Sequence, residues 1–221
     1  MKSTASRILA AALLAACLPI AAASAADVPR ARFGGDPSTP EDIRILARFS
    51  RCVADRQASR ARPILAMDYR SRDYRSALRR LAESNWGCAP LGTLRFSGVL
   101  FAGGLAEALL NASIGPDALA AHVAIDPARA PIAARDENEL MSLCTVRAAP
   151  AEISALLQTE AASPQEAAAL RALIPHVTSC LAAGQRLSLN RPFLRSVLVL
   201  AAYRLSDHNG WAPVRAAAPA G

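Results

Sequence analysis

The chain has 221 residues, of which 52% are hydrophobic, and its formal net charge is +7. A chain of this length and composition is long enough to fold around a hydrophobic core, which excludes a short peptide, and it fits one domain or two small ones. The positive charge is almost entirely arginine, because Lys2 is the only lysine.

The N-terminus has the pattern of an export signal. Lys2 and Arg7 precede an apolar run of eleven residues, Ile8–Leu18. That run is shorter than the ~20 residues that span a bilayer. Small residues follow Pro19 and suit a signal peptidase, so we expect residues 1–26 to be removed. The segment therefore predicts a periplasmic or secreted protein with no transmembrane segment after cleavage.

A lipoprotein is the alternative interpretation of the same segment. The tetrapeptide Leu14-Ala15-Ala16-Cys17 resembles a lipobox, in which Cys17 would be lipidated and become the first residue. The continuation Leu18-Pro19 is unusual for that motif, and a better-formed cleavage site lies just downstream. Both interpretations place the protein outside the cytoplasm.

Helix-start signals recur along the rest of the chain. Thr39-Pro40-Glu41-Asp42 combines an N-capping residue with acids in the first helical turn. Ser71 and Ser97 are expected to cap two further helices, the second of which, GVLFAGGLAEALL, is apolar on nearly all sides. In the second half, Ser163-Pro164-Gln165-Glu166 predicts a capping box, and Asn190 precedes the apolar FLRSVLVLAAYRL. No strand-like alternation of useful length occurs, so the predicted fold class is all-α.

An internal repeat organises these helices. ALRRLAESNWGC (Ala77–Cys88) and ALRALIPHVTSC (Ala169–Cys180) are identical at five of twelve positions and lie 92 residues apart. The matches extend with one inserted residue, and they predict helical repeats at 39–111 and 135–205. Between them, 112–134 reads as a linker broken by three prolines, with one or two helical turns near its start. The Pro/Ala-rich residues 206–221 are expected to form a disordered tail.

Four cysteines remain after the predicted cleavage site: Cys52, Cys88, Cys144 and Cys180. An even number of cysteines in an exported protein predicts disulfides, and no close CxxC pair indicates redox chemistry. Three pairings are possible, and all three respect the repeat symmetry. Before a duplication, a single copy had to fold alone. Each copy is therefore expected to pair its own cysteines, Cys52–Cys88 and Cys144–Cys180.

The second repeat, with its capped SPQEAAALRAL helix, its cysteine before a Gly-containing turn and its apolar last helix, resembles a group of small exported bacterial proteins. These carry a cysteine-bearing helical unit that is often duplicated. The resemblance covers most of 140–204 and, more weakly, 48–110. It implies a compartment and a fold unit, and it supplies neither an activity nor catalytic residues.

The sequence contains no recognisable catalytic motif. His122, His176 and His208 lack the spacing of a metal pair, and HExxH, GxSxG, SxxK and Gly-rich phosphate loops are absent. We therefore predict no catalytic residue, no metal site and no cofactor. Glu107, the one ionisable residue of its apolar helix, is expected on an exposed edge. Gly103-Gly104 in the same helix is expected to permit close helix packing.

The arginines are concentrated in the first repeat. Residues 44–80 contain eleven arginines and three acids, whereas the matching 136–172 contains two arginines and six acids. This asymmetry predicts an anion-binding face. The expected contacts are Arg70, Arg72, Arg75 and Arg79, interleaved with Tyr69 and Tyr74. A spacing of three and four residues places the last three arginines on one helix face.

Two functions are compatible with these features. The first is a non-enzymatic exported protein that binds an anionic envelope partner: an acidic polymer, lipid phosphate, nucleic acid or an acidic protein. The second is an enzyme whose site is assembled between the two repeats, which a polar, enclosed pocket there would favour. The alternative interpretation of the arginine face is that its side chains bind no partner and only face water, in a protein whose composition is rich in arginine.

Overall fold

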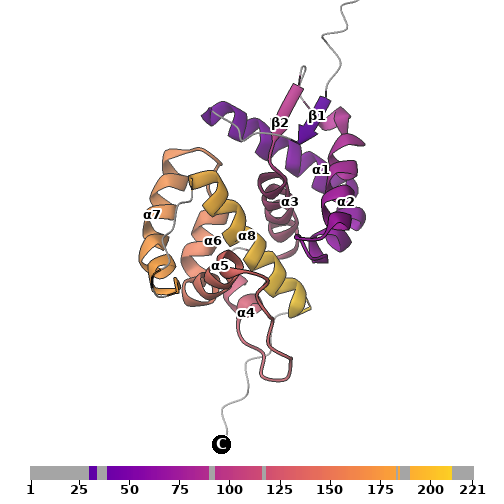
Figure 1. The fold of residues 1–221 in the computed structure, drawn as a ribbon. Coiled ribbons are helices and arrows are strands. Elements are labelled where there is room, and N and C mark those ends of the chain that lie inside the picture. Colours follow the sequence, from indigo (N-terminus) through magenta and orange to yellow (C-terminus); the bar gives the residue numbers. More distant parts are fainter. Residues whose placement is uncertain are drawn as a thin grey trace, which may run out of the picture.

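A computed structural model describes residues 30–33, 39–89, 93–115, 118–182, 184 and 190–210. The predicted signal peptide (1–26), with Cys17, lies outside the described residues. The predicted all-α class is confirmed, since the described part contains eight α-helices and only two short strands. Figure 1 shows the helices as two groups that meet along α3 and α8.

The first group, which we call the first unit, comprises β1 (Arg30–Phe33), α1 (Pro40–Ala66), α2 (Arg72–Glu83), the 3-10 turn η2 (Trp86–Cys88), β2 (Thr93–Phe96) and α3 (Gly98–Ser113). The second unit comprises α5 (Glu137–Ala148), α6 (Pro150–Leu157), α7 (Pro164–Ser179) and α8 (Arg191–His208). The short helix α4 (Leu119–Val123) lies in the connection between them. No single helix of the described part combines the length and the apolarity that a membrane crossing requires.

The helix starts follow the capping signals, with two differences. Ser71, Ser163 and Asn190 each accept a hydrogen bond from the backbone N–H three residues ahead, and Thr39 forms a capping box with Asp42. Ser97 occupies the N-cap position of α3, but its side chain makes no capping bond. The capping box expected at Ser163 is also wrong in detail, because the Glu166 carboxylate accepts from the N–H of Ala162 at 2.9 Å instead.

The two units contain corresponding elements in the same order. Shifted by 92 residues, α2 falls on α7; shifted by 93, α3 falls on α8. The long helix α1 falls on α5 and α6 together. Its non-helical residue Gln57 (φ −133°, ψ 30°) coincides with Ala149 (φ −139°, ψ 56°), which separates α5 from α6. The correspondence is what a duplication predicts, and the duplication itself stays a prediction.

Each unit is closed by a disulfide, and the pairing is the predicted one. Cys52 of α1 bonds to Cys88 of η2, and Cys144 of α5 bonds to Cys180, which follows α7. Both bonds join residues 36 apart, with Cα–Cα distances of 5.8 and 5.7 Å. Two disulfides indicate an oxidising, non-cytoplasmic compartment.

The central helices approach one another closely at two glycines. A Cβ atom on Gly103 would lie 2.6 Å from the Ser196 Cβ of α8, and one on Gly104 would lie 2.5 Å from the Ser50 Cβ of α1. Such separations are far below van der Waals contact, so only glycine fits at either position. The expected role of Gly103-Gly104 in close packing is confirmed, and it is what brings α3 against α1 and α8.

The small parallel ladder of β1 and β2 was not predicted. It pairs Arg30 with Thr93 and Phe33 with Phe96 over four residues. The buried ring of Phe96 packs against Phe49 and Phe101, with centroids 5.7 and 5.4 Å apart. A strand of four residues is too short for its alternation to be detected in the sequence. The packing of the Phe96 ring against Phe49 and Phe101, which holds β2 in place, is a tertiary contact that the sequence does not show.

One predicted boundary is wrong, and the linker is more closely packed than expected. The tail was expected from residue 206, but α8 continues to His208 and Ser206 is buried. The Asn209 side chain donates to the His122 and Ala124 carbonyls at 2.7 and 2.9 Å. The expected linker is likewise docked, because the His208 Nε2 is 2.9 Å from the Ala130 carbonyl. Residues 211–221 lie outside the described part.

Candidate functional site

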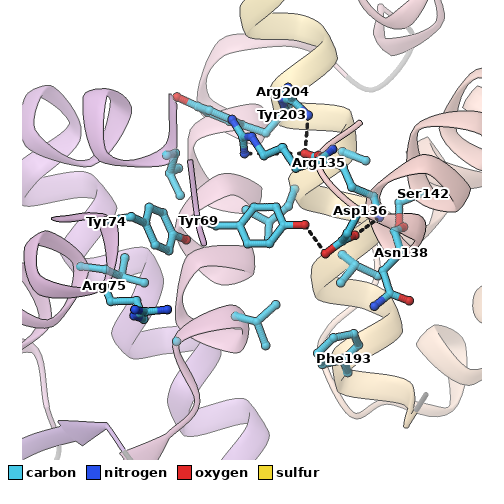
Figure 2. A pocket seen from close by; sticks show the side chains of 18 of the residues that line it. Tyr69, Tyr74, Arg75, Arg135, Asp136, Asn138, Ser142, Phe193, Tyr203 and Arg204 are labelled. Atoms are coloured by element: carbon cyan, nitrogen blue, oxygen red, sulfur yellow. Dashed lines mark hydrogen bonds and ion pairs between the residues drawn. The ribbon is translucent and has the colours of Figure 1, made fainter. Parts of the chain in front are cut away.

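A cavity of about 400 Å³ lies between the two units (Figure 2). The first unit supplies the end of α1, the turn before α2, α2 itself and the start of α3. The second unit supplies α5, the residues just before it, and α8. This volume is within the range of ordinary small-ligand sites, ~300–1,000 Å³.

The wall contributed by α8 is apolar. Phe193, Val197, Leu200 and Ala201 line the cavity, and their spacing places them on one face of the helix. Val197 and Leu200 are only partly buried although they are aliphatic, because this face meets the cavity instead of a packed neighbour. Across the cavity, Tyr74 and Leu78 of α2 and Leu65 of α1 complete the wall.

Two of the four predicted arginines reach the cavity. Arg75 and Arg79 lie on the side of α2 that borders it, next to the buried face of the helix. Arg75 Nη1 donates to the Arg70 carbonyl at 3.2 Å, and no described carboxylate pairs with Arg75. Figure 2 shows Arg75 on the opposite side of the cavity from Asn138 and Phe193. Arg75 therefore gives the α2 side of the cavity a positive charge, and Arg79 borders the cavity one turn further along the helix.

The other two predicted contacts lie elsewhere. Arg72 is exposed on α2 and does not line the cavity. Arg70 pairs with Asp68 at 3.2 Å and donates to the Arg135 carbonyl at 2.7 Å. The Arg70 guanidinium lowers the pKa of the Asp68 carboxyl. The structure thus divides the predicted group into two residues at the cavity and two away from it.

The acids at the cavity are already engaged. The Tyr69 hydroxyl donates to Asp136, as Figure 2 shows, and Asp136 also caps α5 by accepting from the Glu139 N–H at 2.9 Å. Glu139 pairs with Arg204 and, at 3.6 Å, with Arg135. Glu139 is therefore neutralised by arginines, whereas Asp136 keeps its charge and is hydrogen-bonded to a hydroxyl and a backbone N–H. Neither acid pairs with Arg75.

The tyrosines have roles other than the predicted ones. The Arg135 guanidinium lies 5.4 Å from the Tyr69 ring centroid, so Tyr69 joins the two units and does not support the α2 arginines. Burial, followed by the bond to Asp136, raises the pKa of Tyr69. Tyr74 is buried in the cavity wall, and burial raises its pKa to about 12.

A second, much smaller cavity occupies the corresponding position on the other side of the α3–α8 contact. It measures about 40 Å³. With the offsets of 92 and 93 residues, Tyr69 corresponds to Ala161, Tyr74 to Glu166, and Leu200 to Glu107, and each partner lines the smaller cavity. The units therefore meet at two related places: the large one, which we call the open cavity, and the small one, which we call the closed place because side chains nearly fill it.

Buried charges fill the closed place. Arg195 of α8 donates to Glu107 at 2.8 and 2.9 Å, to Glu166 at 3.3 Å and to the Thr159 hydroxyl at 2.9 Å. The prediction that Glu107 lies on an exposed edge is wrong, because its side chain is only 18% exposed and bonds across the unit boundary. Its partner is 88 residues away, so helix periodicity gave no signal for the pair.

The open cavity combines arginines with an apolar wall, an arrangement that suits the binding of a ligand. Its described lining residues include no histidine or cysteine, and its serine, Ser142, donates within the helix to the Asn138 carbonyl at 2.7 Å. Nowhere in the described part do three or more metal-ligating side chains cluster. A further depression of about 450 Å³ lies near α4, and the described residues of its wall carry no charge.

Comparisons of the chain with protein-family models, with curated proteins and with solved structures find no match.

Proposed function

We propose that the protein is an exported, non-enzymatic binding protein that holds an anionic ligand in the cavity between its two helical units. The observation that carries the proposal is the position of Arg75 and Arg79 on the wall of that cavity, whose two acids already have other partners. A guanidinium that borders an apolar cavity attracts an anion more strongly than one surrounded by water, because the lower dielectric screens the charge less.

The compartment and the duplication belong to the same proposal. Removal of residues 1–26 would deliver the protein to the periplasm or the medium, and lipidation of Cys17 is the alternative route. The two disulfides and the matched order of elements support export and duplication. After duplication, one junction between the units would have kept an open cavity while the other was filled by the Arg195 cluster.

A pair of fluorescent probes tests the proposal. 8-Anilinonaphthalene-1-sulfonate and neutral N-phenyl-1-naphthylamine share their rings and differ in the sulfonate. We expect the oxidised protein to bind the sulfonate more tightly, and we expect this preference to weaken as salt rises. Arg75→Ala and Arg79→Ala should each reduce the preference severalfold.

The chain offers a matched control. Arg171 of α7 corresponds to Arg79 by the offset of 92, is exposed, and does not line the cavity. Arg171→Ala removes the same charge and should leave sulfonate binding unchanged. Arg72→Ala separates the proposal from an acidic polymer lying across α2, since it should weaken polymer binding only. Equal loss in the Arg79 and Arg171 variants would contradict the proposal.

A further inference from the structure

We infer that the ligand is a single-chain amphipath, with one anionic head group at Arg75 and Arg79 and a flexible apolar chain along α8. This inference rests on the proposed function and adds the chemical class of the ligand. The two halves of such a molecule match the two kinds of wall that the cavity has.

The shape of the apolar wall favours a chain. The lining of α8 runs from Phe193 through Val197 and Leu200 to Arg204. At ~1.5 Å per residue this stripe is roughly 16 Å long. Its middle is aliphatic, and hydrogen-bonding groups lie at its borders. A sugar would leave its hydroxyl groups unpaired against such a wall, whereas an acyl chain loses nothing by leaving water.

The head-group end has a second source of positive potential. Gly98 and Val99, the first residues of α3, line the same cavity. The side chain of Ser97 makes no capping bond to this helix, so the N-cap residue leaves the first N–H groups to other partners. A helix start adds favourable potential for an anion to that of the two arginines.

The corresponding closed place shows which substitutions make the difference. There, Glu107 and Glu166 occupy the positions of Leu200 and Tyr74, and Ala167 occupies the position of Arg75. The acids lie in the interior, where they neutralise Arg195, and no cation corresponds to Arg75. In the open cavity the apolar Leu200 and the uncharged Tyr74 stand at the two positions of these acids, and Arg75 stands at the position of Ala167, as an amphipathic anion requires.

A chain-length series tests the inference. Hexanoate, octanoate, decanoate and dodecanoate, each below its micellar concentration, would compete with bound anilinonaphthalene sulfonate. We expect affinity to rise about fourfold per added methylene until the cavity is full. Dodecyltrimethylammonium, with the same chain and the opposite charge, should compete poorly. Lauroyl lysophosphatidylglycerol and dodecanoate both carry a twelve-carbon acyl chain. A comparison of their affinities distinguishes a phosphate from a carboxylate head group.

Two variants locate the chain. Val197→Trp fills the cavity and should abolish the dependence on chain length. Because that change can disturb α8, Phe193→Ala is the second variant: it enlarges the cavity, and the preferred chain should become longer. Affinity that does not vary with chain length, or tight binding of the ammonium, would overturn the inference. In that case, binding of anilinonaphthalene sulfonate that still depends on Arg75 and Arg79 would leave the proposed function standing. If the wild-type protein bound neither the sulfonate nor any fatty acid, both the proposed function and this inference would be wrong.

Discussion

The guanidinium of Arg195 and the carboxylate of Glu107 form two hydrogen bonds, of 2.8 and 2.9 Å, across the boundary between the units. Arg195 is 95% buried, and it also holds Glu166. Burial of the group by itself would lower its pKa, but the two carboxylates outweigh burial and raise the pKa of Arg195. The pair therefore joins α3 to α8 as a permanently charged contact.

Removal of Arg195 should destabilise the protein strongly. Arg195→Ala leaves two carboxylates without their cation, and such a loss costs about 3–5 kcal/mol. Urea unfolding of the oxidised protein would measure the change in free energy. Arg191→Ala, an exposed position one turn earlier on α8, is the control and should change stability little. A loss below about 1 kcal/mol in Arg195→Ala would show that the cluster does not join the units.

Either disulfide should contribute substantially to stability. Each closes a loop of 36 residues, for which chain entropy predicts about 4 kcal/mol. The double variant Cys52→Ser/Cys88→Ser should therefore unfold at markedly lower urea concentration than the wild type. Peptide mapping without reduction provides the check on connectivity, and a peptide linking Cys52 to Cys144 or Cys180 would contradict the structure.

Gly103 should not tolerate a side chain. In Gly103→Val the new atoms would overlap Ser196 on α8, and overpacking of this kind costs about 1–3 kcal/mol. Gly87→Ala is the comparison, because its Cβ would meet only the mobile end of Arg56, at 3.5 Å. Thermal unfolding of both variants measures the difference. Equal melting temperatures would mean that α3 and α8 do not approach as closely as described.

Alkali should weaken the fold through Tyr74. Burial raises its pKa from 10 to about 12, so the folded state retains the phenolic proton longer than the unfolded state does. The stabilising contribution is complete below pH 10 and decreases as pH rises toward 12, by up to about 3 kcal/mol. Tyr74→Phe should show a correspondingly smaller decrease over this window. Unfolding titrations at pH 9 and 12, compared between the two proteins, would detect it, and identical pH slopes would contradict it.

The features that the sequence predicted correctly are local or periodic. Ser71, Ser163 and Asn190 signal their helices through residues three positions away, and the expectation that each repeat folds as a unit identified both disulfides. The cavity and the ion cluster depend instead on how α2 and α5 meet α8. Nothing near Glu107 indicates Arg195, and nothing near Arg75 indicates Val197. Charge counts found the arginine helix, but only the packing of the units shows that Arg75 and Arg79 border a cavity and that Arg72 does not.

The proposed binding of an amphipathic anion in the cavity between the units can be observed directly. A crystal of the oxidised protein with ω-bromododecanoate would locate the bromine by anomalous scattering. The account predicts one bromine peak between α2 and α8, with the carboxylate within hydrogen-bond reach of Arg75 or Arg79. A bromine peak elsewhere, or an empty cavity at saturating ligand, would contradict it.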